Sequence, residues 1–161
     1  MEVIICISMV NVMTEIRFYH LQRQSQHQVL PVLLSKALAK GHRIVVKLRD
    51  KLSVEQMNEH LWSYHTNSFL PHGSEKDGNS EHQPIWLTEK DENPNQADVL
   101  ILGDGVESEI MSDFELCCEM LNGQDDEQIA ASRVRWKQYK DHDFEVTYWQ
   151  QTDQGGWEQK A

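Results

Sequence analysis

Short stretches of β-branched and aromatic residues recur along the chain, and their length is that of strands rather than helices. They occupy residues 16–21, 43–48, 85–88 and 98–102, and each predicts a β-strand. The last four residues of the fourth stretch are all apolar, which is typical of a parallel strand buried on both faces. A further apolar run at 113–121 fits strand or helix by its periodicity. Its place between a buried strand and an Asn-Gly turn favours a strand.

A helical period marks three other segments. Residues 24–40 carry apolar side chains at this spacing, and Pro31 is compatible with a helix only if the ordered turns begin near it. Ser53 is followed three residues later by glutamine, a capping-box pattern that predicts a helix over 53–64. The third helix is predicted over 125–140, since three acids open it and cations close it, an order that suits the helix dipole.

Strands that alternate with helices predict right-handed parallel crossovers, and residues 144–151 add a last extended segment. We therefore expect an α/β fold: a single three-layer domain at 13–161, with a mostly parallel central sheet flanked by helices and a polar surface loop at 73–83. Residues 1–12 lack the basic region of a signal peptide and are too short to cross a bilayer. We expect them to be an upstream extension, with Met13 as the native start.

The composition excludes some classes of protein. A chain of 161 residues fits one domain, and 26 acidic against 15 basic residues argue against a general nucleic-acid binder. Cys6, Cys117 and Cys118 form neither a paired framework nor a C-x-x-C metal motif. We interpret them as reduced thiols of a cytoplasmic protein, with buried packing for the adjacent pair.

One segment departs from this acidity. Residues 133–140 hold four cations, two aromatic rings and no acid. On a helix, four of them would share one face, at positions i, i+3, i+4 and i+7: Arg133, Trp136, Lys137 and Lys140. Such a face can accept an acidic peptide with an apolar tip. The same spacing also fits a solvated helix end with a core tryptophan, so spacing alone leaves both interpretations open.

No pattern in the chain indicates a catalytic, metal or cofactor site. The eight histidines form no H-x-x-x-H pair with a third ligand, so we favour solvated or capping roles for them. Gly103-Asp104-Gly105 follows the buried strand and could approach a phosphate, but neither phosphate-binding glycine motif is present. A plain turn is the favoured interpretation. An α/β nucleotide-binding enzyme that uses this turn is the alternative function.

Five motifs, taken in order, resemble the chi subunit of bacterial DNA polymerase III holoenzyme. The resemblance runs from Ile16 to Trp149 and implies a compact α/β domain of Rossmann-like topology without a nucleotide site. The motifs are Leu61-Trp62, Ser68-Phe69-Leu70-Pro71-His72, Pro84-Ile85-Trp86-Leu87, Ala97-Asp98-Val99-Leu100-Ile101 and Arg135-Trp136-Lys137-Gln138-Tyr139-Lys140.

The resemblance also implies a function: a non-catalytic accessory subunit of the clamp-loader complex in the bacterial cytoplasm, without cofactor or metal and without direct DNA binding. In that family one surface binds the psi subunit, and Trp62 and Phe69 match its aromatic positions. A second surface binds the acidic C-terminal tail of single-stranded DNA-binding protein, and Arg133, Trp136 and Lys137 match it. Without the resemblance, core packing would be the favoured role of Trp62 and Phe69.

Physical chemistry is consistent with the second match. A tail that ends in acids, an apolar ring and a free carboxylate needs an arginine fork, a second cation and an apolar platform. Arg133 would bind the terminal carboxylate, Trp136 would pack against the ring, and Lys137 would attract the acids. The acids at 125–127 would disfavour approach from the start of the helix.

Overall fold

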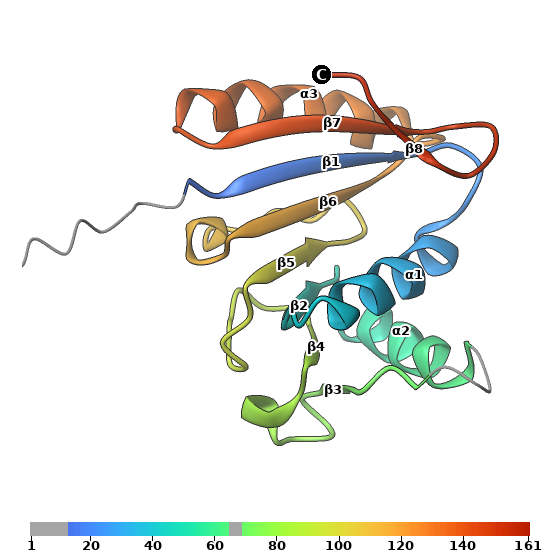
Figure 1. Cartoon of the computed structure of the whole chain (residues 1–161), viewed down its shortest axis with the longest axis vertical. Coiled ribbons are helices and arrows are strands. Elements are labelled where there is room, and N and C mark those ends of the chain that lie inside the picture. The colour runs from blue at the N-terminus through green and yellow to red at the C-terminus, as the bar shows by residue number, and fades with distance from the viewer. Residues whose placement is uncertain (1–12, 65–68) are drawn as a thin grey trace, which may run out of the picture.

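The computed structural model describes residues 13–64 and 69–161 (Figure 1). In these ranges the chain forms three α-helices, two short 3-10 turns and one sheet of eight strands. The helices are α1 (Gln26–Ala39), α2 (Lys51–Ser63) and α3 (Asp126–Asp141), and the 3-10 turns are η1 (Ser80–His82) and η2 (Met111–Asp113). The strands are β1 (Glu15–Leu21), β2 (Ile44–Lys47), β3 (His72–Ser74), β4 (Ile85–Thr88), β5 (Val99–Leu102), β6 (Leu116–Asn122), β7 (Glu145–Gln151) and β8 (Trp157–Gln159).

The strands lie in the order β3-β4-β2-β5-β6-β1-β7-β8. Every neighbouring pair is parallel except β7 and β8, which pair antiparallel. In Figure 1, α1 and α2 lie over one face of this sheet and α3 lies against the other. The predicted α/β fold, with a mostly parallel sheet between helices, is confirmed.

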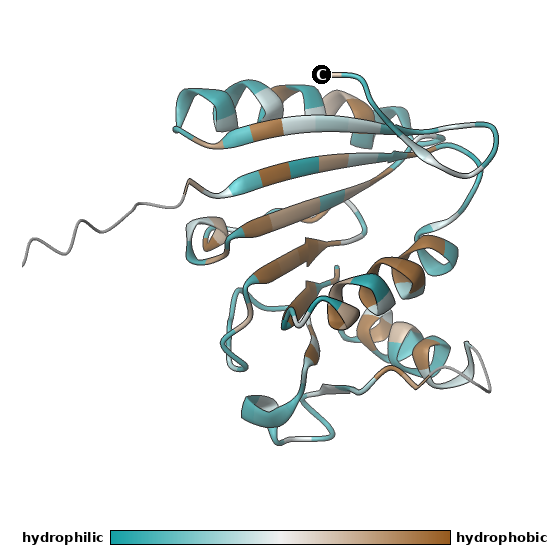
Figure 2. Ribbon diagram, viewed as in Figure 1, coloured by the Kyte–Doolittle hydropathy of each residue, from teal (hydrophilic) through white to brown (hydrophobic). Residues whose placement is uncertain are grey.

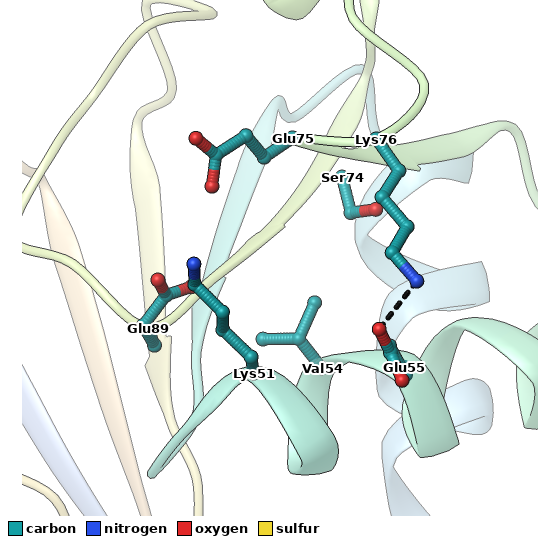
Figure 3. A pocket seen from close by; sticks show the side chains of 7 residues that line it. All are labelled: Lys51, Val54, Glu55, Ser74, Glu75, Lys76 and Glu89. Atoms are coloured by element: carbon teal, nitrogen blue, oxygen red, sulfur yellow. Dashed lines mark ion pairs between the residues drawn. The ribbon is translucent and has the colours of Figure 1, made fainter.

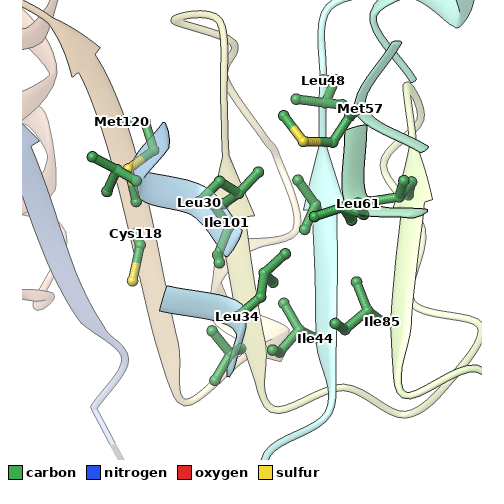
Figure 4. Packing of buried hydrophobic residues seen from close by; sticks show 14 of the residues in the cluster. Leu30, Leu34, Ile44, Leu48, Met57, Leu61, Ile85, Ile101, Cys118 and Met120 are labelled. Carbon is green, nitrogen blue, oxygen red and sulfur yellow. The ribbon is translucent and has the colours of Figure 1, made fainter. Parts of the chain in front are cut away.

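Each face of the sheet has its own hydrophobic core. Under α1 and α2, side chains such as Leu30, Leu34 and Met57 pack against Ile44 and Ile101 of the central strands (Figure 4). The second core lies on the α3 side and includes side chains of the two connections that follow β4 and β5. Figure 2 shows β5 and most of α1 in hydrophobic colours, while α3 is mainly hydrophilic. The sequence of α3 therefore buries only a narrow side of the helix.

Helix α1 differs from its prediction because Pro31 lies inside it rather than near its start. Proline has no N–H to donate to the carbonyl four residues earlier, which here belongs to His27. The His27 carbonyl instead lies 2.5 Å from Nε2 of His60 on α2. A side chain from the neighbouring helix thus satisfies the carbonyl that Pro31 leaves free, and the helix begins at Gln26.

Helix α2 begins earlier than the capping-box pattern predicted. Its N-cap is Asp50, whose carboxylate accepts a hydrogen bond from the Ser53 backbone N–H at 2.8 Å. Ser53 therefore lies in the first turn, and the prediction that it caps the helix was wrong. Aspartate is as good an N-cap as serine, and Asp50 stands three residues after Lys47, the last residue of β2.

Two edge strands were not predicted. The predicted loop at 73–83 shares its first residues with β3 and contains η1. At the other edge, Gly155 adopts a φ of 84° in the turn that leads into β8. This hairpin explains the chain after Trp149, which matched none of the motifs. The predicted upstream extension, 1–12, lies outside the described residues, as do Cys6 and, in the second motif, Ser68.

Candidate functional site

The candidate tail-binding residues lie on α3, which has clear local reasons to be a helix. The Asp125 side chain accepts hydrogen bonds from the backbone N–H groups of Glu127 and Gln128, at 3.0 and 3.2 Å. Asp126 and Glu127 lie in the first turn and Lys140 in the last. These charges complement the helix dipole, and the predicted helix over 125–140 is confirmed.

The structure brings the three predicted tail-binding residues together on one side of α3. Arg133 and Lys137 are exposed, and Trp136 between them is half-buried. The Trp136 ring packs 5.9 Å from the Phe18 ring, measured between centroids. Among the described residues neither Arg133 nor Lys137 forms an ion pair. The two cations therefore flank a fixed aromatic side chain and keep their charges available to a partner. We call Arg133, Trp136, Lys137 and Lys140 the α3 patch.

Lys140 was not among the predicted tail-binding residues, but the structure places its side chain beside Trp136. Its Nζ lies 4.5 Å from the centroid of the Trp136 ring, within the range of a cation–π interaction. The i, i+4 spacing was the signal that could have found this contact. Lys140 covers part of the ring, so a partner that stacks on Trp136 has to move it or bind beside it.

Arg135, only two residues from Arg133, has a structural role instead. Its side chain is 5% exposed and its Nε lies 3.0 Å from Oε1 of Glu119, which is 2% exposed. The Tyr139 hydroxyl donates a hydrogen bond to the same oxygen at 3.1 Å. In the described structure, Oε2 of Glu119 has no hydrogen-bond partner. Burial raises the pKa of Glu119 to about 7, despite the opposing effects of Arg135 and Tyr139.

The α3 patch continues onto β7 through Tyr148. The Tyr148 and Trp136 rings meet edge to face, with centroids 6.2 Å apart, and the Tyr148 hydroxyl lies 2.5 Å from Nδ1 of His20. Burial raises the pKa of Tyr148, and the nearby Arg133 guanidinium acts in the opposite direction. Burial also lowers the pKa of His20, which favours the neutral imidazole that can accept this hydrogen bond. Tyr148 and His20 are site neighbours that the sequence did not reveal.

Trp62 and Phe69 form a second surface at the end of α2. Their side chains are 56% and 72% exposed, and their ring centroids lie 5.9 Å apart. Trp62 also packs 4.7 Å from the ring of His72, which is itself buried. Core packing, the role favoured by residue type alone, is not what these two rings do. They form an exposed aromatic pair, which we call the α2 patch.

The Gly103-Asp104-Gly105 turn is occupied by the protein's own groups. The Asp104 backbone N–H donates to Oε1 of Gln26 at 2.7 Å, and the Gly103 N–H donates to the Lys47 carbonyl. A phosphate needs such amides free, and the Asp104 carboxylate would repel it. A Cβ on Gly103 would lie 2.7 Å from Leu48, so this glycine allows close packing rather than phosphate approach. The turn gives no support to the nucleotide-binding alternative.

A second hollow in the described structure lies beside α2. The pocket drawn in Figure 3, with a volume of 230 Å³, lies between α2 and β3 and is bordered by charges of both signs. There Lys76 pairs with Glu55, as the dashed line marks. The described ranges contain no cluster of three metal-binding side chains. Likewise, none of the helices described here is long and apolar enough to cross a membrane.

Cys117 and Cys118 are both buried, as predicted for the pair. Burial raises the pKa of the Cys117 thiol, and it raises that of Cys118 to about 12. A thiol with so high a pKa is a poor nucleophile at neutral pH, because the thiolate is the reactive form. Both residues therefore contribute packing to the two cores rather than redox chemistry.

These observations define a small α/β protein with two groups of aromatic and basic side chains at its surface, one along α3 and one at the end of α2. A sequence model of the family "DNA polymerase III chi subunit, HolC" matches residues 13–147. The chain therefore belongs to the DNA polymerase III chi subunit family. It is also 31% identical over 90 residues to the "Probable DNA polymerase III subunit chi" of Rickettsia prowazekii (strain Madrid E). That alignment covers 56% of this chain and 54% of the relative, so the chain spans about half the length of that relative.

Proposed function

We propose that this protein is a non-catalytic accessory subunit of the replicative DNA polymerase. In this role it binds the acidic C-terminal tail of single-stranded DNA-binding protein through the α3 patch and joins it to the clamp loader. The observation that supports the proposal most is the pair of exposed cations without ion-pair partners in the described structure, Arg133 and Lys137, on either side of Trp136. In a chain with a net charge of -11, this arrangement is a local attraction for an anionic partner.

Each residue of the patch has a distinct task in this proposal. Arg133 can bind a terminal carboxylate with two parallel hydrogen bonds, as a guanidinium does best. Trp136 is held against Phe18, so little side-chain entropy is lost when an apolar ring packs on it. Lys137 attracts the acids upstream of that ring. Because much of this attraction acts between exposed charges, affinity should fall as salt rises.

The second contact of the proposed function is made by the α2 patch. We propose that Trp62 and Phe69 bind the psi subunit or another clamp-loader subunit. Two large aromatic side chains this exposed are unusual on an isolated protein surface, and aromatic residues are the typical anchors of protein interfaces. A cytoplasmic location follows from the proposed role, and neither a cofactor nor direct DNA contact is part of it.

Tail binding is tested by fluorescence anisotropy with a labelled peptide that ends in acids, an aromatic residue and a free carboxylate. Arg133→Ala should weaken binding roughly tenfold to a hundredfold, because a charge-assisted hydrogen bond is lost. Lys137→Ala should have a smaller, salt-sensitive effect. Arg49→Ala is the matched control, since Arg49 is an exposed arginine outside the patch. Absence of binding at low salt, or equal affinities for Arg133→Ala and Arg49→Ala, would contradict the assignment.

The α2 patch is tested separately, by co-purification with the psi subunit. Trp62→Ala and Phe69→Ala should each reduce recovery of the complex without changing the stability of the isolated protein, because both side chains are largely exposed. Leu52→Ala is the control, since Leu52 is 62% exposed on the same helix. Full recovery of the complex by both aromatic variants would refute this surface while leaving the tail site untouched.

A further inference from the structure

A groove lies on the face of the sheet opposite α3, where α1 stops covering it. It runs between the last turns of α1 and strands β1 and β7, with a volume of 350 Å³. Lys36 of α1 and Lys40, the C-cap of this helix, form one side, and side chains of the three strands β1, β7 and β8 form the other. The residues that matter to its chemistry are Arg17, Tyr19, Lys36, Lys40, Trp149 and Trp157.

The groove is a basic region of an acidic protein. None of its lining residues is acidic, although the chain as a whole carries a net charge of -11. Arg17 is partly neutralised by Glu15, since its Nε lies 2.7 Å from Oε1 of that residue. Lys36 and Lys40 are exposed and form no ion pair with any described residue. Both lie near the C-terminus of α1 and also offset the partial negative charge there, so the net field of the groove is moderate.

Aromatic rings give the groove an apolar wall. The Trp157 ring of β8 meets the Tyr19 ring of β1 edge to face, with centroids 4.9 Å apart. Trp149 lies beside them, and the Arg17 guanidinium carbon is 5.8 Å from the centroid of its ring. Cys118 contributes to the floor as a buried thiol. These rings hold one another in place, so an apolar side chain of a bound segment can pack against them. The lysines then face the residues that flank this side chain in the segment.

This groove is distinct from the α3 patch. Alternation along β7 points Tyr148 toward α3, so Trp149 points to the other face, where it packs with the core under α1. Trp157 has the same orientation, because it contacts Tyr19 of that core. Both tryptophans also lie beyond residue 147, the last residue that the family model matches. The two tryptophans of the wall thus lie outside the matched range, whereas Tyr19 lies within it.

We propose that the groove is a second docking site, which binds an internal acidic segment of a partner protein with one apolar side chain packed against the wall that Tyr19, Trp149 and Trp157 form. Charge complementarity selects the acidic flanks, and the ring wall selects the apolar residue. A single-stranded nucleic acid is the less favoured ligand. It would extend its charges past the groove onto a surface of the same sign, whereas a short peptide segment need not.

The proposal is tested by NMR with the full-length, ¹⁵N-labelled protein. The first probe is the peptide acetyl-Glu-Glu-Leu-Phe-Glu-Glu-amide, whose blocked ends remove the free carboxylate that the α3 patch is proposed to bind. The expected result is a set of shifts at the indole N–H of Trp149 and Trp157 and at the amides of Lys36 and Lys40. The tail peptide with a free carboxylate should instead shift resonances around Arg133.

Charge-reversal variants make the test decisive. Lys36→Glu with Lys40→Glu should weaken binding of the blocked peptide by about tenfold or more, because two attractions become repulsions. Both side chains are exposed, so the fold should survive. The matched control is Lys51→Glu with Lys90→Glu, a reversal of two exposed lysines elsewhere, and it should bind as the unmodified protein does. Trp157→Ala should weaken binding of this blocked peptide. The loss should be smaller for a second peptide in which alanine replaces both Leu and Phe, because that peptide has no apolar side chain to pack on Trp157.

Three results would overturn the proposal: no shifts in the groove at millimolar peptide, equal weakening by the groove and control reversals, or groove shifts produced by an oligothymidylate and not by the peptide. The last result would assign the groove to nucleic acid instead. Because the blocked peptide and the free-carboxylate peptide report on different faces of the sheet, either site can fail while the other stands.

Discussion

The surroundings of Glu119 predict how the free energy of unfolding changes with pH. Glu119 is almost fully buried beneath α3, and Arg135 and Tyr139 both contact its Oε1. Two effects compete there: burial disfavours the carboxylate, and Arg135 favours it. The folded-state pKa of about 7, against an ordinary value of 4.5, means that burial prevails. Replacing Glu119 with glutamine removes the titrating group and keeps a side chain of the same shape.

The sign follows from proton uptake. Between pH 4.5 and 7 the folded protein holds a proton on Glu119 that the unfolded chain has released, so this group reduces stability as pH rises. A shift of 2.5 units, the difference between 7 and 4.5, corresponds to about 3 kcal/mol at 1.36 kcal/mol per unit. The unmodified protein should therefore lose roughly that amount relative to Glu119→Gln between pH 4.5 and pH 8.

Urea unfolding followed by tryptophan fluorescence measures this difference. Both proteins are unfolded at a series of pH values, and the free energies of unfolding are subtracted at each pH. Every other titrating group is common to the two proteins, so its contribution largely cancels in the difference. A difference that stays constant with pH would refute the reasoning. A difference of the opposite sign, in which the unmodified protein gains stability as pH rises, would show that Arg135 prevails over burial.

Three further stability predictions follow from single contacts, each measured by the same urea titration. Arg135→Met should cost about 2 kcal/mol at pH 8, where Glu119 is ionised, because it removes a hydrogen bond to a buried charged group. Gly123→Ala should cost about 1–3 kcal/mol, because the new methyl group would lie 2.3 Å from the Leu21 carbonyl oxygen. His60→Ala should cost at most about 1 kcal/mol, since the His27 carbonyl that Pro31 leaves free can turn to water at this exposed site.

Each of these predictions has a control within the chain. Arg133→Met removes an exposed arginine from the same helix and should leave stability unchanged, so equal losses for the two arginine variants would contradict the burial argument. Gly78 has a positive φ, but a Cβ added there would meet no other atom within 4 Å. Gly78→Ala therefore reports the cost of backbone strain without a collision, whereas Gly123→Ala reports a collision. His82→Ala removes an exposed histidine without the contact to α1. A loss as large as that of His60→Ala would contradict the role given to the His27 carbonyl.

The sequence predicted the central strands and the third helix well, because those signals are local. A run of four apolar residues at β5 can hardly be anything but a buried strand, and the acids before α3 mark its start. The starts of α1 and α2 were harder. Helix α1 can begin before Pro31 because of a contact from another helix, between His60 and the carbonyl four residues before Pro31. Helix α2 begins at a local N-cap, Asp50, whereas the capping-box pattern pointed to Ser53, three residues later.

The candidate site likewise combines features that local sequence predicts with features that depend on distant contacts. The helical period placed Arg133, Trp136 and Lys137 on one face correctly, but it could not separate an exposed arginine from a buried one. Arg135 is buried because Glu119 lies beneath it on β6, and no pattern in the helix itself records that neighbour. Edge strands such as β8 were missed for a related reason: a strand of three residues carries too little periodicity to be recognised.

The positions of the two patches bear on whether both proposed partners can bind at once. α2 packs against β3 and β4, and α3 packs against β6 and β7 on the other face. The sheet order separates β4 from β7 by five strand spacings, which at roughly 4.8 Å each amount to about 24 Å. A partner on Trp62 and Phe69 and a short tail on the α3 patch therefore approach from opposite faces and opposite ends of the sheet. Neither has to displace the other, which is what a protein needs in order to join two partners rather than exchange them.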